Sequence, residues 1–218
     1  MEFYFENAAN NKKIIGLNGN RELVLSGRQA CEESLNWTIH GFSLTKTCLL
    51  VDEVFPEDVF DSDEFITRKL FLKSNKVVFS KGMFYYRQDN SNAITKTFST
   101  KNFYTLNTLF RIFSLLNENN FEKSLVFNSQ FSLLSRYLQL SAIYKLYDFQ
   151  TEIQKEETAL FLSDFRKNKL INSFYFLNFS YVIISLKLKY ILLLVIFKVP
   201  VLLDFVTKIY VKKMKLIV

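Results

Sequence analysis

The chain has 218 residues, of which 49% are hydrophobic and 17% aromatic, and its formal net charge is +7. Its 24 Phe and 11 Tyr side chains need burial in protein or bilayer, which excludes disorder over most of the length. With only 5 Gly and 2 Pro, a turn-dense sandwich or a propeller is disfavoured relative to a helix-rich fold. Cys31, Cys48 and the single histidine, His40, cannot assemble a four-ligand zinc site from Cys and His alone. We expect reduced thiols.

The first fifty residues contain few regular patterns. Residues 1–20 are rich in Asn and Lys without a clear period, and we expect them to form an exposed arm or an edge strand. Apolar residues at near-helical spacing predict a short helix within Arg21–Leu35. Alternation of apolar and polar residues predicts a strand at Phe42–Thr45, and Cys48–Val51 reads as a further strand or a helix end.

A clearer helix, two strands and a helical region follow Pro56. The acidic run Glu57–Glu64 leads into an amphipathic stretch that ends with basic residues, the order that complements a helix dipole. Strands are predicted at Lys76–Phe79 and Met83–Tyr86, separated by a turn. Apolar residues at steps of three and four from Phe103 to Phe113 predict a helix, and helices are expected to dominate from there.

The segment from residue 170 onward differs in composition. Phe174–Val206 is nearly all apolar, and after Asp164 the only acidic residue is Asp204. Interruptions keep every run short of the roughly 20 residues that a membrane span needs. These are Lys187, Lys189, Lys198 and Pro200. An apolar face flanked by cations predicts helices lying on an anionic membrane surface, and the alternative is a buried pair of C-terminal helices.

An ordered set of motifs occupies residues 55–95. Phe55-Pro56-Glu57 precedes Asp63, and the second predicted strand ends in Tyr85-Tyr86-Arg87-Gln88. The order and spacing resemble the C-terminal catalytic part of family 2 glycosyltransferases. In that family an aromatic-Pro-Glu segment leads to a Glu-Asp pair, and a Tyr-Tyr-Arg strand end precedes a loop ending in Ser-Ile-Thr.

This chain departs from the family pattern at two positions. Ser62 stands where the family often has Glu, and Ala93 replaces the usual serine of the loop. Upstream, Trp37, His40 and Lys46 look like a diverged form of the family's Trp and Lys-Leu-Tyr-Arg-Arg segment. The resemblance covers about residues 21–99.

The resemblance implies an α/β fold in which residues 21–99 form the acceptor-side part of a GT-A-like domain. A helical region at 100–169 and membrane-surface helices at 170–218 would follow. It implies transfer of a sugar, with inversion, from a nucleotide sugar to a hydroxyl of a growing surface polysaccharide or a lipid-linked acceptor. The expected place is peripheral, on the cytoplasmic face of the bacterial inner membrane.

No nucleotide-binding half is recognised in the sequence. We therefore expect a truncated enzyme, or one whose donor site is supplied by a separate chain, and weak activity for this chain alone. Mg or Mn would accompany the nucleotide sugar if that half is supplied. The alternative is a non-catalytic, basic membrane-surface interaction protein or an inactive remnant. Nucleic acid is not expected as a partner, because basic and aromatic residues do not interleave.

Asp63 matches the family's general base, which removes a proton from the acceptor hydroxyl. A carboxylate within hydrogen-bond reach lets deprotonation accompany attack by the poorly nucleophilic alcohol. A place at a helix start would favour the ionised form. Two other interpretations stay open. Asp61 or Ser62 caps the helix, or Asp61-Ser62-Asp63 is a DxD motif that holds a divalent metal, although no nucleotide-binding region precedes it.

Five further residues are candidates for acceptor or phosphate binding. They are Trp37, His40, Asp61, Glu64 and Arg87. The guanidinium of Arg87 can pair with two phosphate oxygens, or it forms an ion pair with Asp89. Trp37 could stack on a sugar ring or be a half-buried core aromatic, and His40 could orient an acceptor or be an ordinary satisfied polar residue.

Overall fold

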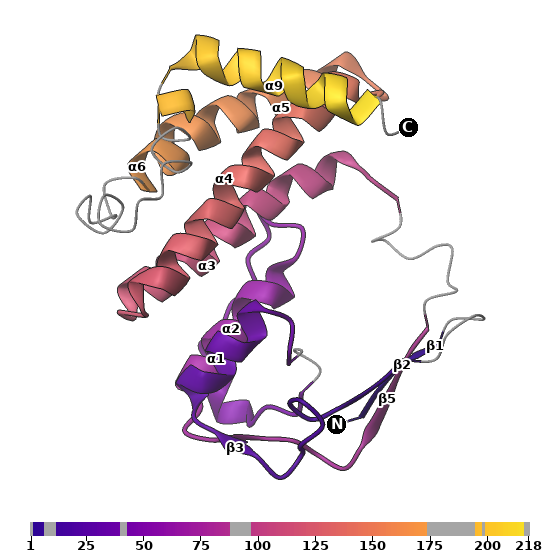
Figure 1. Ribbon diagram of the computed structural model, residues 1–218, viewed down its shortest axis with the longest axis vertical. Helices are drawn as coiled ribbons and strands as arrows, with labels where there is room; N and C mark the ends of the chain where they lie inside the picture. Colours follow the sequence, from indigo (N-terminus) through magenta and orange to yellow (C-terminus); the bar gives the residue numbers. More distant parts are fainter. Residues whose placement is uncertain are drawn as a thin grey trace. The chain divides into compact units, whose positions relative to one another are not determined.

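The structure is a computed structural model (Figure 1) that describes residues 2–6, 12–39, 43–87, 97–173, 195–197 and 199–215. Side chains are described for these residues except 2–6, 12–15, 83–87 and 213–215. Contacts divide the chain into two compact units. The mixed unit comprises Met1–Glu57 and Asp61–Phe98, and the helical unit comprises Asp58–Phe60 and Ser99–Val218. Most of the described chain is helical, and its strands all belong to the mixed unit.

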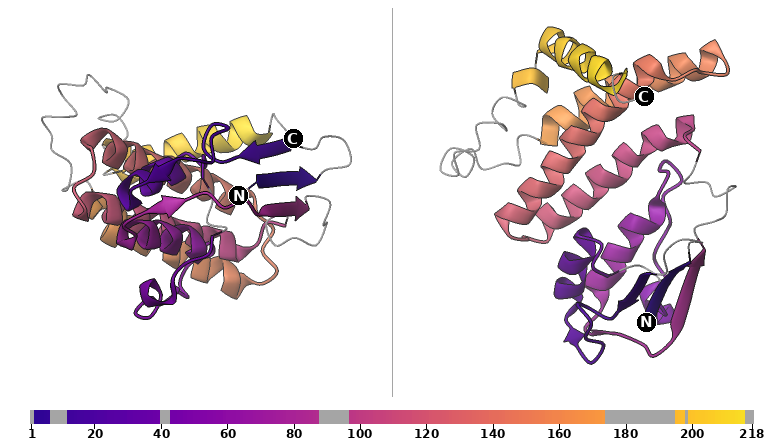
Figure 2. Two further views of the ribbon diagram at one scale, coloured as in Figure 1. Left: turned by 90° about the horizontal axis from the view of Figure 1, so that it is seen from below. Right: turned by 45° about the vertical axis from the view of Figure 1, so that its right-hand side comes forward.

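The mixed unit has a three-stranded sheet in the order β2-β1-β5. Its strands are β1 (Glu2–Glu6), β2 (Lys12–Ile15) and β5 (Met83–Arg87), and Figure 2 shows them side by side. β1 pairs antiparallel with β2 and parallel with β5. The expectation of an exposed arm or edge strand at the N-terminus is therefore wrong for β1, which is the central strand. β5 confirms the strand predicted at Met83–Tyr86.

A second, two-stranded ladder corrects the predicted start of the first helix. β3 (Val24–Leu25) pairs antiparallel with β4 (Val77–Val78), which lies inside the strand predicted at Lys76–Phe79. Helix α1 (Gly27–Leu35) begins only after this strand. Ser26 is extended and forms a capping box with Gln29, whose backbone N–H donates to the Ser26 hydroxyl at 3.2 Å. The predicted helix exists, but it is shorter than Arg21–Leu35.

Helix α2 (Ser62–Lys73) packs against α1. Its buried apolar side chains Ile66 and Phe71 join Ala30 and Cys31 of α1 in the core of the mixed unit. Burial raises the pKa of the Cys31 thiol to about 11, so this thiol stays protonated and unreactive at neutral pH. The acidic start and the basic Lys73 in the last turn agree with the predicted polarity of the helix.

Arg68 links α2 to α1 inside this core. Its side chain is buried, and its Nη2 donates to the backbone carbonyl of Ser34 at 2.9 Å. Its Nη1 lies 2.5 Å from a carboxylate oxygen of Glu64, four residues earlier on α2. A buried guanidinium is tolerated only when it is paired and hydrogen-bonded. Arg68 therefore fixes the end of α1 against the start of α2.

The segment between the two helices contains no strand in its described part. Residues 43–46 are irregular, and Thr47–Leu49 forms a 3-10 turn, η1. The strand predicted at Phe42–Thr45 is therefore wrong over residues 43–45, and Phe42 lies outside the described residues. Further along, the buried carboxylate of Glu53 forms ion pairs with Lys69, at 2.7 Å, and with Lys73. These ion pairs attach the segment to the outer face of α2.

Replacing Glu53 with glutamine should lower the free energy of unfolding by about 1 kcal/mol at neutral pH. Burial raises the pKa of Glu53, but the hydrogen bonds and charges of Lys69 and Lys73 outweigh burial, so the pKa lies below 4.5. Because the pKa of Glu53 is lower in the folded chain than in the unfolded chain, its carboxylate stabilises the fold when the pH is above the unfolded pKa. This stabilisation is lost as the pH falls through the folded pKa. In urea unfolding, the free energies of unfolding of the wild type and of Glu53→Gln should differ at neutral pH and converge near about pH 3. A difference in unfolding free energy that persists in acid would contradict the stabilising role of these ion pairs.

The helical unit begins with the 3-10 turn η3 (Thr100–Tyr104) and helix α3 (Thr105–Glu118). Helix α4 (Lys123–Leu146) lies beside α3, as Figures 1 and 2 show. Asn120, with φ of 52°, lies in the tight turn that joins them. The predicted apolar stripe is confirmed, because Phe103, Leu106 and Phe113 are almost fully buried.

Helix α5 (Glu152–Asp164) continues through a π-helical turn, η4 (Phe165–Leu170), into α6 (Ile171–Ser173). Inside the core, the fully buried amide of Gln130 donates to the backbone carbonyl of Ser173 at 3.0 Å. This bond ties α6 to α4 and gives the buried amide the partner that it needs.

The final helix, α9 (Pro200–Lys215), packs on α4. Pro200 begins it, at a position where a missing N–H costs no helical hydrogen bond. Of the apolar stretch Phe174–Val206, residues 174–194 and 198 lie outside the described residues. Among the described helices, none combines the length and the apolar character that crossing a bilayer requires.

Candidate functional site

Asp63 lies in the first turn of α2, with its side chain exposed. The backbone N–H groups at a helix N-terminus carry partial positive charge. Within the described part of the chain, no hydrogen bond or ion pair engages the Asp63 side chain. The predicted helix start is thus confirmed, and it leaves Asp63 accessible to a ligand.

The two neighbouring carboxylates are in different surroundings. Asp61 occupies the N-cap position of α2, but its side chain makes no capping hydrogen bond. Glu64 is paired with Arg68, and burial raises the pKa of Glu64 although the hydrogen bond from Arg68 acts in the opposite direction. Of these three carboxylates, only that of Asp63 is both exposed and uncommitted.

A cavity of about 840 Å³ opens in the mixed unit next to this face of α2. Its wall includes Thr67, which lies one helical turn after Asp63 and so shares a face of α2 with it. The volume falls within the range of small-molecule sites in proteins. Asp63 therefore lies one turn of helix from a space large enough for a ligand.

Hydroxyl groups and lysines dominate the polar lining of the cavity. The hydroxyls belong to Thr38, Ser43, Thr45, Thr67, Ser74 and Ser80. Lys46 and Lys76 also line it, and both are exposed. Hydroxyls both donate and accept hydrogen bonds, which suits a polyhydroxylated ligand, and the ammonium groups would attract an anionic one.

Trp37, which precedes the cavity-lining residue Thr38 in the sequence, has an unusual backbone conformation. Its φ is 58°, in the left-handed region that usually requires glycine, and it immediately follows the C-cap of α1. Its side chain is 59% exposed, so the expectation of a half-buried core aromatic is wrong. The next residue, Thr38, lines the cavity. A bulky aromatic held at a strained position and turned to solvent is a feature associated with binding sites.

The other predicted site residues are placed only in part. His40 lies outside the described residues, and Arg87 ends β5 with its side chain outside them. Among the described residues, no group of three or more His, Cys, Asp or Glu side chains is arranged to hold a metal ion. The structure thus brings Asp63, Asp61 and Glu64 together at the start of α2 and places Trp37 at the end of α1.

Sequence reasoning missed the cavity. Its hydroxyl-bearing residues come from several separated segments with no common motif, so only the abundance of Ser and Thr around residues 38–47 and 74–80 could have signalled it. Both segments belong to the mixed unit, although they are about thirty residues apart in the sequence. No family model, no curated protein and no solved structure matches this chain.

Proposed function

We propose that the chain provides the acceptor side of an inverting sugar transfer from a nucleotide sugar, with Asp63 as the general base. The observation that carries the proposal is the position of Asp63. It is an exposed, uncommitted carboxylate at a helix N-terminus, one turn from a cavity whose mostly apolar wall also carries several serine and threonine hydroxyls. The resemblance of residues 55–95 to family 2 glycosyltransferases supplies the reaction type. A partial GT-A-like arrangement of the mixed unit belongs to the same proposal.

The proposed chemistry needs a carboxylate that is ionised before the acceptor binds. Asp63 lies exposed in the first turn of α2, and Glu64, which is held by Arg68, does not compete with it for the acceptor. The acceptor hydroxyl would donate a hydrogen bond to the Asp63 carboxylate. The proton would move to that carboxylate as the hydroxyl oxygen attacks the anomeric carbon and the nucleoside diphosphate leaves.

Acceptor binding would use Trp37 and the adjoining cavity. The apolar face of a sugar ring can lie flat on an exposed indole, while its hydroxyls bond to serine and threonine side chains. Lys46 and Lys76 would favour an acceptor that carries phosphate, such as a lipid-linked saccharide. The strained backbone at Trp37 would hold the indole in place before the sugar arrives.

The donor would bind to a nucleotide-binding half outside these residues. Mg²⁺ or Mn²⁺ would arrive with the nucleotide sugar and would neutralise charge on the leaving diphosphate. Because Mg²⁺ is commonly held by one or two carboxylates together with substrate phosphates, the number of carboxylates at Asp61 and Asp63 does not decide between a metal and an acceptor. Only Asp63 of the two is exposed, and we therefore assign it to the acceptor.

Trp37 offers a direct test of acceptor binding, because it is the only tryptophan of the chain. Adding oligosaccharides should change its fluorescence in a saturable way, since a stacked sugar displaces water from the indole. Isothermal titration calorimetry should show roughly tenfold weaker binding for Trp37→Ala, the equivalent of losing about 1.4 kcal/mol.

The matched control is Phe55→Ala, which removes another half-exposed aromatic side chain from the same unit. It should bind saccharides like the wild type. Calorimetric binding without any change in Trp37 emission would place the sugar elsewhere. An absence of saccharide binding by the wild-type chain would reject the proposed function.

A further inference from the structure

Helix α9 presents apolar side chains on two opposite faces. One face packs on α4 and buries Leu203 and Thr207, which are 9% and 2% exposed. The opposite face carries Val201, Phe205 and Ile209, spaced four residues apart and therefore in one row along the helix. These three residues, here named the outer stripe, are 76%, 61% and 54% exposed. A helix that only completed the core would need no such row.

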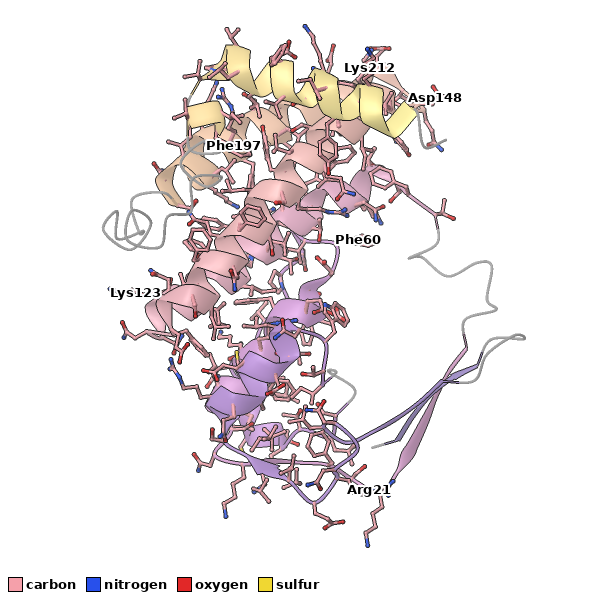
Figure 3. All side chains as sticks on the ribbon, in the orientation of Figure 1. Arg21, Phe60, Lys123, Asp148, Phe197 and Lys212 are labelled. Carbon is pink, nitrogen blue, oxygen red and sulfur yellow. The ribbon has the colours of Figure 1, made fainter. Side chains whose placement is uncertain are left out.

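The charges around the outer stripe are positive. Lys208 and Lys212 are exposed next to it, and Figure 3 shows Lys212 near the end of α9. The only acidic residue of the helix, Asp204, is paired with Lys145 at 2.5 Å and with Lys208 at 2.8 Å. Because two lysines pair with the single Asp204 carboxylate, the net charge beside the outer stripe is positive. An anionic surface with an apolar interior is complementary to this combination.

Another exposed apolar residue of the same unit has the opposite surroundings. Leu160 of α5 is 64% exposed, about as much as Phe205. Its neighbours one turn away on α5 are Glu156, Glu157 and Asp164, all exposed. An anionic membrane would repel this position. The contrast separates a basic apolar surface on α9 from an acidic one on α5.

We infer that the outer stripe of α9 docks the helical unit onto an anionic phospholipid bilayer. Phe205 and its two row neighbours would enter the boundary between headgroups and acyl chains, and Lys208 and Lys212 would lie among the phosphates. This inference goes beyond sugar transfer, because the surface needs neither donor nor acceptor. It assigns membrane contact to a specific face of one helix.

The test is sedimentation of the full chain with vesicles of phosphatidylcholine alone or of phosphatidylcholine with phosphatidylglycerol, without any sugar. The wild type should bind the anionic vesicles. Phe205→Glu should weaken this binding roughly tenfold or more. Lys212→Gln should weaken it roughly fivefold. Leu160→Glu is the matched control and should bind like the wild type, and circular dichroism should show that all variants keep their helix content.

Two outcomes would overturn the inference. Equal binding by the wild type and a folded Phe205→Glu variant would place the contact on another surface. A wild-type chain that ignores the vesicles would also reject it, and a concentration-dependent dimer abolished by Phe205→Glu would then identify a second copy as the occupant. Neither outcome bears on saccharide binding at Trp37, so failure here is distinguishable from failure of the proposed function.

Discussion

Replacing Gly27 with alanine should destabilise the mixed unit by about 3 kcal/mol or more. A Cβ atom at this position would lie 2.0 Å from the backbone carbonyl oxygen of Phe71 and 2.2 Å from that of Ser74. Both distances are far below the 3.0 Å that real Cβ contacts respect, and backbone carbonyls at a helix end cannot swing aside as a side chain can. Helix α1 would have to move by about 1 Å from α2.

This displacement would also reach the proposed site, because Trp37 lies two residues after Leu35, the last residue of α1, and Asp63 lies in the first turn of α2. We therefore expect Gly27→Ala to weaken saccharide binding as well as stability. Urea unfolding measures the first effect, with Gly82→Ala as the matched control. A Cβ at Gly82 would meet only the Ser80 hydroxyl, at 3.3 Å, so that variant should unfold like the wild type. Equal stability of the two variants would show that α1 and α2 pack less closely than described.

Elements with strong local patterns could be predicted from the sequence. The acidic start and basic end of α2 and the apolar stripe of α3 are properties of consecutive residues, so they identified both helices. The aromatic run of β5 likewise predicted a strand. The position of Asp63 at a helix start followed from the same local pattern.

Long-range pairing could not be predicted in this way. β1 is parallel to β5, about eighty residues later, and nothing in Glu2–Glu6 indicates a central strand. The apolar residues of Val24–Leu25 fit a helical spacing, yet pairing with β4 places them in a strand. The reverse error occurred at residues 43–45, where alternation predicted a strand that has no partner strand among the described residues.

The candidate site was predictable only at its carboxylates. The exposure of Trp37 depends on its left-handed backbone after the C-cap of α1, and such a conformation has no signature in a large aromatic residue. The cavity arises from the packing of several segments. The outer stripe of α9 lies in a region whose composition suggested membrane contact, but the face involved required knowing which side packs on α4.

The role of Asp63 can be separated from that of Asp61 by conservative substitution. A general base contributes about 10²- to 10⁴-fold to the rate, so Asp63→Asn should lose that factor in kcat while acceptor binding is kept. The Asp61 side chain makes no capping hydrogen bond, and Asn has nearly the same size as Asp and is equally accepted at an N-cap, so Asp61→Asn should leave helix α2 and transfer nearly unchanged. A DxD metal site would need both carboxylates, and both variants would then fail alike.

The decisive measurement is transfer of labelled sugar from a nucleotide sugar to an oligosaccharide that the chain binds. The chain would be combined with the nucleotide-binding half of a family 2 glycosyltransferase. We predict transfer by the wild-type and Asp61→Asn chains, and loss of transfer by an Asp63→Asn chain that still binds the acceptor. Equal transfer by the wild-type and Asp63→Asn chains, or no transfer by a wild-type chain saturated with acceptor, would contradict the assignment of Asp63 as the base.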